Sequence, residues 1–127
     1  MEKSSRKILV VEDDRSVAVA LMKNLTLEGY TNVMHAADGA IAWDLLFHQH
    51  QEFDLVITDN QMPRLRGIDL IRKMSHFSPQ KEIPVIMMSS DIGLLRELAR
   101  SLGVRMCIEK PFDIDKLFEE MEKVFAS

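Results

Sequence analysis

Residues 54–63 read DLVITDNQMP, in which a short apolar run is followed by a polar turn that ends in Pro63. Residues 8–11 (ILVV) and 85–88 (VIMM) are two further runs of the same kind. Because apolar residues in these runs are continuous and do not alternate with polar ones, each run is typical of a strand that is covered by helices on both faces. The three runs predict the central strands of a parallel sheet.

The rest of the chain fits an alternation of strands and helices. Two weaker segments, residues 32–35 and 104–108, complete a set of five predicted strands. Apolar residues at helical spacing follow the strands, and Gly29 and Gly103 are where two of the helices are expected to end. Such alternation predicts right-handed crossovers and helices on both faces of the sheet. We therefore expect an α/β fold built as a three-layer sandwich.

Composition narrows the class of protein. The chain has 127 residues, 46% hydrophobic and 28% charged, which is ordinary for one soluble domain. A net charge of −4 argues against broad nucleic-acid binding, and the single Cys107 excludes an internal disulfide and fits a reducing compartment. No apolar run approaches the roughly 18 residues that span a bilayer, and no signal peptide precedes the first predicted strand. We expect a cytoplasmic protein that contacts neither nucleic acid nor a membrane directly.

Polar residues follow four of the predicted strands. Taken singly, each has an ordinary structural explanation; Asp14 and Asp91, for example, are expected to be helix N-caps rather than ligands. In a parallel sheet, however, the carboxyl ends of the strands meet at one edge, near the point where strand order reverses. The side chains expected at that edge are those of Glu12, Asp13, Asp59, Ser89 and Lys110.

The charges of these residues indicate what the edge can bind. Three carboxylates in a small space repel one another and raise one another's pKa values. Lys110 offsets one negative charge, and a divalent cation would offset the other two. Oxygen ligands that are open to water suit Mg²⁺ better than zinc. A hard cation, a lysine and a hydroxyl can together hold phosphoryl oxygens, and phosphoryl transfer requires mainly positioning and charge neutralisation. Asp59 is then the candidate nucleophile.

Four segments, in this order and at this spacing, resemble the bacterial response-regulator receiver domain of two-component signalling, and in particular chemotaxis regulators. They are ILVVEDD at 8–14, DLVITDNQMP at 54–63 with Gly67 behind it, PVIMMSSD at 84–91 and KPF at 110–112. The resemblance implies a flavodoxin-like doubly wound sheet of five parallel strands, in the order 2-1-3-4-5, with five helices. It further implies a single receiver domain over residues 1–127, with its core at about 7–125 and no effector domain in the chain.

The same resemblance implies roles for the residues at the sheet edge. Asp59 would accept a phosphoryl group from the phosphohistidine of a sensor histidine kinase or a phosphotransfer protein. Glu12 and Asp13 would bind Mg²⁺, or alternatively Mn²⁺, together with Asp59 and the backbone carbonyl of Gln61. Ser89 and Lys110 would each hold a phosphoryl oxygen. The residues implied to modulate the lifetime of the phosphoryl group are Gln61, Ser90 and Asp91.

The sequence departs from the family pattern at two positions. Receivers usually carry an aromatic residue three positions before the lysine, where this chain has Cys107, so the implied switch comprises Ser89 and Cys107. Arg66 stands where an acidic residue is common. By resemblance, the face formed by the fourth helix, fifth strand and fifth helix contacts a downstream effector protein, and phosphorylation can promote a dimer. The domain is not expected to be an enzyme beyond assisting its own phosphorylation and autodephosphorylation.

Three alternatives remain open at this point. An aspartate-nucleophile hydrolase of the haloacid dehalogenase type also uses Mg²⁺, but its nucleophile follows the first strand in an Asp-x-Asp pattern, where this chain has Glu12-Asp13-Asp14. An FMN carrier of similar topology needs a phosphate-binding loop after the first strand, where Asp13-Asp14-Arg15 would repel the phosphate. A pseudo-receiver that signals by binding alone is disfavoured by the full set of site residues, although Cys107 keeps it open.

Overall fold

The computed structural model describes residues 2–77, 80–91 and 93–126 and shows alternating strands and helices along them. The strands are β1 (Lys7–Val11), β2 (Asn32–Ala36), β3 (Leu55–Asp59), β4 (Val85–Ser89) and β5 (Met106–Glu109). The helices are α1 (Arg15–Glu28), α2 (Gly39–Trp43), α3 (Gly67–Met74), α4 (Gly93–Ser101) and α5 (Ile114–Ala126). Short helical turns occur at η1 (Lys3–Ser5), η2 (Asp44–His48, a π-helical turn) and η3 (Gln80–Glu82).

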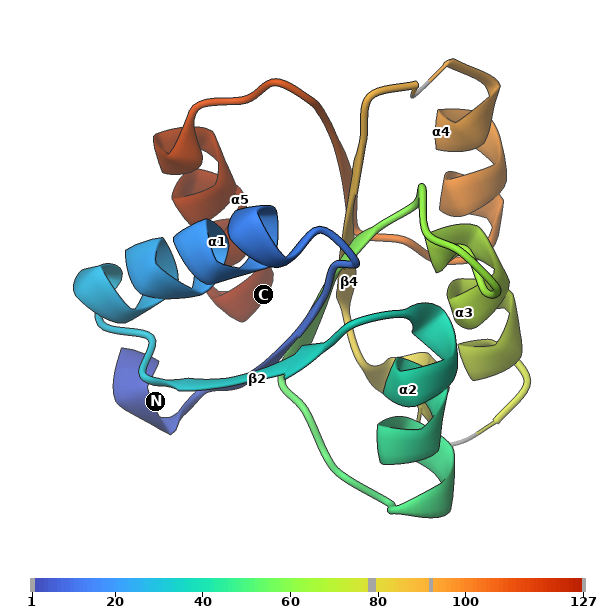
Figure 1. Cartoon of the computed structure of the whole chain (residues 1–127), viewed down its shortest axis with the longest axis horizontal. Coiled ribbons are helices and arrows are strands. Elements are labelled where there is room, and N and C mark those ends of the chain that lie inside the picture. The colour runs from blue at the N-terminus through green and yellow to red at the C-terminus, as the bar shows by residue number, and fades with distance from the viewer. Residues whose placement is uncertain (1, 78–79, 92, 127) are drawn as a thin grey trace.

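The five strands form one sheet in the order β2-β1-β3-β4-β5, and every neighbouring pair is parallel. This confirms the order and the flavodoxin-like fold expected from the sequence. Helices α1 and α5 cover one face of the sheet, and α2, α3 and α4 cover the other (Figure 1). Strand order reverses between β1 and β3, so the carboxyl ends of these two strands border the crevice in which such folds bind ligands.

Side chains from the two faces of each central strand fill two separate cores. Leu9, Val56 and Met87 pack under α2, α3 and α4, whereas Ile57 and Met88 pack under α1 and α5. All five of these side chains are buried. This explains why the central strands are apolar without alternation, because neither face of the sheet meets water.

The sequence predicts both ends of α1 correctly. The Asp14 carboxylate accepts hydrogen bonds from the backbone N–H groups of Ser16 and Val17, at 3.0 and 3.3 Å, so it is the N-cap that the sequence predicts. Gly29 ends the helix in the left-handed conformation, with a φ of 114°. The N-cap role expected of Asp91 depends on residue 92, which lies outside the described residues.

The fifth strand begins later than its apolar residues suggest. The sequence predicts a strand over 104–108, whereas β5 is Met106–Glu109. The backbone N–H of Val104 donates to the carbonyl of Ala99 at 3.0 Å, so Val104 still belongs to the turn that closes α4. No helix in the described part of the chain is long and apolar enough to cross a membrane.

Candidate functional site

The sheet register brings the predicted site residues to one edge. Asp59 is the last residue of β3 and lies opposite Met88 of β4, while Ser89 ends β4 opposite Glu109. Glu12 and Asp13 directly follow β1, whose last residue lies opposite Thr58. Lys110 directly follows β5, and its peptide bond to Pro111 is cis.

The three carboxylates expected at this edge form a compact acidic cluster, defined here as Glu12, Asp13 and Asp59. Each offers an oxygen that lies within 4.8 Å of the oxygens of the other two. Glu12 and Asp59 are buried, with 1% and 4% of their surface exposed, whereas Asp13 is exposed. Burial, and then the charge of Asp59, raises the pKa of Glu12, although the backbone N–H of Asp14 and the ammonium of Lys110 oppose this shift.

Lys110 is the counter-ion of the acidic cluster. Its Nζ atom lies 3.3 Å from Glu12 Oε1 and 3.3 Å from Asp59 Oδ1. Burial of the ammonium works to lower the pKa of Lys110, but the charges of Asp59 and Glu12 outweigh burial and raise it. The lysine is therefore charged at neutral pH, and it neutralises one of the three carboxylates.

One carboxylate oxygen of Asp59 is left without a hydrogen bond. Asp59 Oδ1 is buried, and no donor among the described residues is aligned with it, even though the Lys110 ammonium lies close enough for an ion pair. A buried acceptor without a donor is unfavourable, and here two negative charges remain uncompensated. A hard divalent cation fits both features, because it supplies two positive charges and bonds to carboxylate oxygens.

Two residues without a role in the sequence analysis hold the loop after Asp59 in place. Asn60 is buried; its side-chain oxygen accepts a hydrogen bond from Ile68 N at 2.9 Å, and its own N–H donates to Met88 O at 3.0 Å. A Cβ atom on Gly67 would lie 2.4 Å from the carbonyl oxygen of Asp59, so only glycine allows α3 to approach the strand this closely. An asparagine directly after a predicted buried strand was the signal in the sequence that could have identified Asn60.

A second anchor of the same loop joins it to α2. The Arg64 guanidinium pairs with the carboxylate of Asp38, which is buried and also accepts a hydrogen bond from Ile41 N at 2.9 Å. Arg64 has a φ of 66°, which is uncommon for a residue other than glycine. The ion pair joins residues that are 26 positions apart, and no local pattern predicts it.

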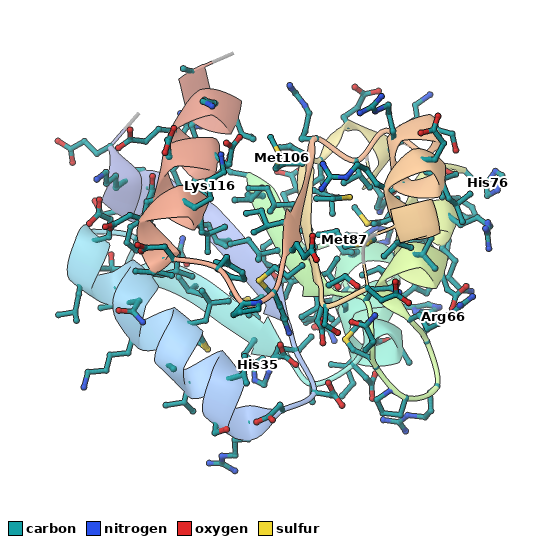
Figure 2. The ribbon with its side chains drawn as sticks, turned by 90° about the horizontal axis from the view of Figure 1, so that it is seen from above. His35, Arg66, His76, Met87, Met106 and Lys116 are labelled. Atoms are coloured by element: carbon teal, nitrogen blue, oxygen red, sulfur yellow. The ribbon has the colours of Figure 1, made fainter. Side chains whose placement is uncertain are left out.

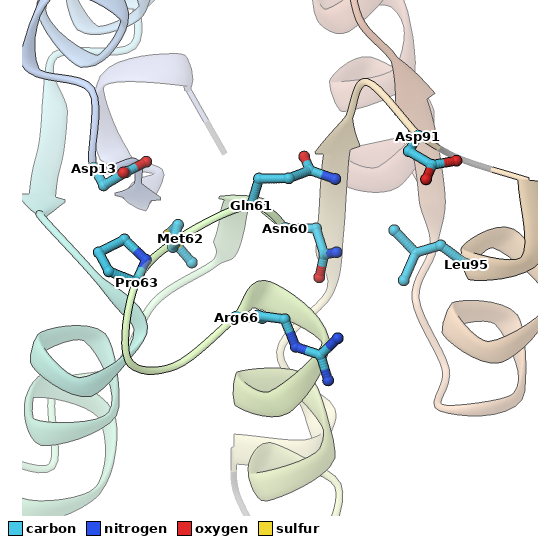
Figure 3. Close-up of a pocket in the computed structure, with 8 residues that line it drawn as sticks. All are labelled: Asp13, Asn60, Gln61, Met62, Pro63, Arg66, Asp91 and Leu95. Carbon is cyan, nitrogen blue, oxygen red and sulfur yellow. The ribbon is translucent and has the colours of Figure 1, made fainter.

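The hydroxyl of Ser89 is buried and already bonded on two sides. It accepts a hydrogen bond from Gln61 Nε2 at 2.9 Å and one from Asp91 N at 3.2 Å. Gln61 and Asp91 are exposed and line a cavity of about 580 Å³ beside the acidic cluster, and in Figure 3 the Gln61 amide points toward the loop that carries Asp91. Ser90 is also exposed, but it lines a different cavity together with Lys110.

The two departures from the family pattern make no hydrogen bond to Ser89 or to the acidic cluster in the described part of the chain. Arg66 directly precedes α3 (Figure 2) and borders the cavity that Gln61 and Asp91 also line, and its Nε atom pairs with Asp69 Oδ2 at 3.0 Å. Cys107 lies opposite Met87 in the register, is half-buried and packs against the core under α2, α3 and α4. Burial raises the pKa of the Cys107 thiol, although the charges of Arg96 and Arg100 oppose the shift. The thiol is thus mainly protonated and acts as a packing group.

Comparison with known proteins identifies the family to which the chain belongs. The family model described as response regulator receiver domain matches residues 8–122. Chemotaxis protein CheY1 of Helicobacter pylori is 34% identical over 122 residues, which cover 95% of this chain and 98% of that protein. Chemotaxis protein CheY-3 of Vibrio cholerae is 36% identical over 121 residues, 94% of this chain and 91% of the relative.

Solved structures of receivers share the fold. The chemotaxis protein CheY4 of Vibrio cholerae superposes with a TM-score of 0.83 at 28% identity, over 94% of this chain and 98% of that one. A response regulator receiver protein from Pseudomonas putida gives a TM-score of 0.82 at 30% identity, over 94% and 98% of the two chains. The segments that match the family model contain the acidic cluster, Ser89 and Lys110. The chain belongs to the response regulator receiver domain family, whose members act as phosphoacceptor signalling domains.

Proposed function

We propose that this receiver, acting as one domain over residues 1–127, accepts a phosphoryl group on Asp59 in a Mg²⁺-dependent reaction. The observation that carries the proposal is the buried Asp59 carboxylate, which has one oxygen without a hydrogen bond from the described residues and lies close to two other acids and Lys110. The donor would be a phosphohistidine of a sensor histidine kinase or a phosphotransfer protein. Glu12, Asp13, Asp59 and the backbone carbonyl of Gln61 would hold Mg²⁺ or Mn²⁺.

The transfer is a displacement at phosphorus. A carboxylate oxygen of Asp59 attacks, an acyl phosphate O–P bond forms, and the N–P bond to the donor imidazole breaks. The imidazole nitrogen leaves with the bonding electron pair and takes up a proton. A bound Mg²⁺ would supply positive charge for the phosphoryl oxygens. The Lys110 ammonium, already 3.3 Å from Asp59 Oδ1, contributes a further positive charge, and the Ser89 hydroxyl can donate to a phosphoryl oxygen.

Hydrolysis of the acyl phosphate returns the domain to its unphosphorylated state. Water attacks the phosphorus, the O–P bond to Asp59 breaks, and inorganic phosphate and the free carboxylate are released. We propose that the side chains of Gln61, Ser90 and Asp91, all exposed next to the site, set the rate of this hydrolysis. A phosphoryl lifetime that stays unchanged after each is replaced by alanine would count against this assignment.

We propose that the phosphorylated domain contacts a downstream effector protein through the α4–β5–α5 face. Phosphorylation-dependent dimerisation is a second way in which it could signal. Arg96 and Arg100 are exposed on α4, and their charges act on the Cys107 thiol of β5. Ser89 and the packing of Cys107 form the switch in this proposal. We place the domain in the cytoplasm because its lone thiol needs no oxidising compartment.

The test is incubation with acetyl phosphate and Mg²⁺, followed by intact mass and peptide mapping. We expect the wild type to gain one phosphoryl group, which depends on Mg²⁺ and maps to Asp59. The Asp59→Asn variant should gain none, whereas Asp44→Asn, a matched change at an exposed carboxylate on η2, should behave as the wild type. A wild type without an adduct would refute phosphoacceptor activity, and an adduct that persists in Asp59→Asn would move the acceptor elsewhere.

A further inference from the structure

The side-chain amide of Gln61 bridges the two loops that flank Asp59. Gln61 lies in the loop between β3 and α3, and Ser89 begins the loop between β4 and α4. Gln61 Nε2 donates to Ser89 Oγ at 2.9 Å, and Gln61 Oε1 lies 3.3 Å from the same hydroxyl. The two residues are 28 positions apart, so the contact exists only in the folded sheet.

This contact occupies the hydroxyl that phosphorylation needs. A serine hydroxyl has one proton and two lone pairs. Both lone pairs of Ser89 Oγ receive donors, from Gln61 Nε2 and Asp91 N, and its proton has two acceptors in reach, Gln61 Oε1 and Asp91 O at 3.3 and 3.2 Å. The hydroxyl is fully buried, so water does not compete for it. Donation to a phosphoryl oxygen therefore requires the existing bonds to rearrange.

We propose that the Gln61 side chain is a clasp that holds Ser89 and the 89–91 loop in the unphosphorylated conformation, and that phosphorylation opens it. This inference rests on the proposed function, because the phosphoryl group on Asp59 is what competes for the Ser89 hydroxyl. Gln61 is a positioning residue, because it holds the Ser89 hydroxyl in place. Its amide acts through Ser89, separately from any backbone contact to a metal ion.

The loop that carries Gln61 is built so that the side chain alone can move. Asn60 and the ion pair between Arg64 and Asp38 fix the backbone on both sides of Gln61. The Gln61 side chain is exposed and borders the cavity of about 580 Å³, which has room for the amide once it leaves Ser89 (Figure 3). Opening the clasp therefore requires a rotation of the Gln61 side chain and no rearrangement of the loop between β3 and α3.

The clasp also provides a path from Asp59 to α4 that needs no aromatic residue. Ser89 Oγ accepts a hydrogen bond from the N–H of Asp91, and the carbonyl of Asp91 is one of the two acceptors in reach of its proton; α4 begins at Gly93. A hydroxyl proton that turns toward the phosphoryl group no longer bonds the Asp91 carbonyl, which loosens residues 89–91 ahead of the helix. This explains how a receiver with Cys107 at the usual aromatic position can transmit the change.

A double-mutant cycle tests the clasp. Gln61→Leu keeps the size of the side chain but cannot bond Ser89, and Ser89→Ala removes the partner. Two readouts apply to both single variants, the double variant and the wild type: the initial rate of phosphorylation by acetyl phosphate with saturating Mg²⁺, and the amide hydrogen exchange of residues 89–91 in unphosphorylated protein. Gln49→Leu, the same change at an exposed glutamine that directly follows η2, is the matched control.

Gln61→Leu should raise both the phosphorylation rate and the exchange of residues 89–91 by about 2- to 10-fold, the range expected for one lost neutral hydrogen bond. The effect on exchange should vanish in the Ser89→Ala background, and Gln49→Leu should change neither readout. An equal effect of Gln61→Leu in both backgrounds, or unchanged exchange, would overturn the clasp. A wild type that gains no phosphoryl group would instead refute the proposed function, while the exchange data would still decide the clasp.

Discussion

Buried carboxylates occur at two places in this molecule, on α5 and in the acidic cluster, and their environments are opposite. Glu120 on α5 is 2% exposed, yet its Oε1 atom accepts from Lys116 Nζ at 2.9 Å and from Lys123 Nζ at 3.3 Å. The hydrogen bond from Lys116 is the main reason why the pKa of Glu120 is lowered. In the acidic cluster the pKa of Glu12 is raised instead, and Asp59 keeps a buried oxygen without a hydrogen bond among the described residues.

The difference separates an acid that stabilises the fold from acids that are available for chemistry. The single carboxylate of Glu120 pairs with two ammonium groups on its own helix. Its charge is therefore already compensated, and a bound cation would add little stability there. The acidic cluster has one ammonium for three carboxylates, so the folded protein without a cation carries an electrostatic cost there. A bound cation or phosphoryl chemistry can relieve that cost, and four measurements test the contrast.

The largest expected effect is stabilisation by Mg²⁺. At a concentration 100 times the dissociation constant, Mg²⁺ should raise the free energy of unfolding by about 2.7 kcal/mol, because the proposed site exists only in the folded protein. Urea unfolding with Mg²⁺ and with a chelator measures this. The response should disappear in Asp13→Asn and persist in Glu120→Gln. A Mg²⁺ response that survives Asp13→Asn would mean that the ion binds somewhere else.

Glu120→Gln should lower the free energy of unfolding by about 1.5 kcal/mol at pH 7, because charged hydrogen bonds from two lysines are lost. Since the pKa of Glu120 is lowered in the folded state, its contribution is complete above its ordinary pKa of 4.5 and is lost as the pH falls through the folded value. Denaturant unfolding at pH 7 and below pH 4 should show that the difference between wild type and variant shrinks in acid. A difference that does not depend on pH would contradict the ion-pair account.

Glu12→Gln should act in the opposite direction in the presence of a chelator and stabilise the protein by about 1 kcal/mol at pH 7. The pKa of Glu12 is raised above 4.5, so its charged form destabilises the folded state at neutral pH, and this cost declines as the pH falls toward 4.5. The gain from the substitution should therefore fade in acid. A loss of stability at pH 7 would show that the ion pair with Lys110 outweighs burial.

Asp13→Asn should have the smallest effect, a gain of about 0.5 kcal/mol in chelator at low salt, because an exposed carboxylate is well screened. It removes repulsion with Glu12 and Asp59 without breaking any ion pair that the acidic cluster makes with Lys110. Thermal or urea unfolding in low and high salt measures it, and the gain should shrink as salt is added. A gain that does not depend on salt would indicate a cause other than charge.

Much of the fold could be read from local patterns. Three unbroken apolar runs predicted strands covered on both faces, and Asp14 and Gly29 marked the ends of α1. The order of the strands came from the resemblance to receivers, and the structure confirms it. Local patterns failed at the start of β5, where a hydrogen bond from Val104 back to α4 outweighs the β-branched side chain.

The sequence by itself determined which chemical groups end each strand, because side chains and their order are local properties. Even the pairing of Glu120 with Lys116 follows from helical spacing. Only the tertiary structure decided how those groups meet: Lys110 reaches Glu12 across 98 positions, Arg64 reaches Asp38 across 26, and Gln61 reaches Ser89 across 28. Contacts of this kind depend on strand register and on the rotamers of single side chains. No periodicity of the sequence predicts these contacts, and they build the site around three carboxylates that repel one another.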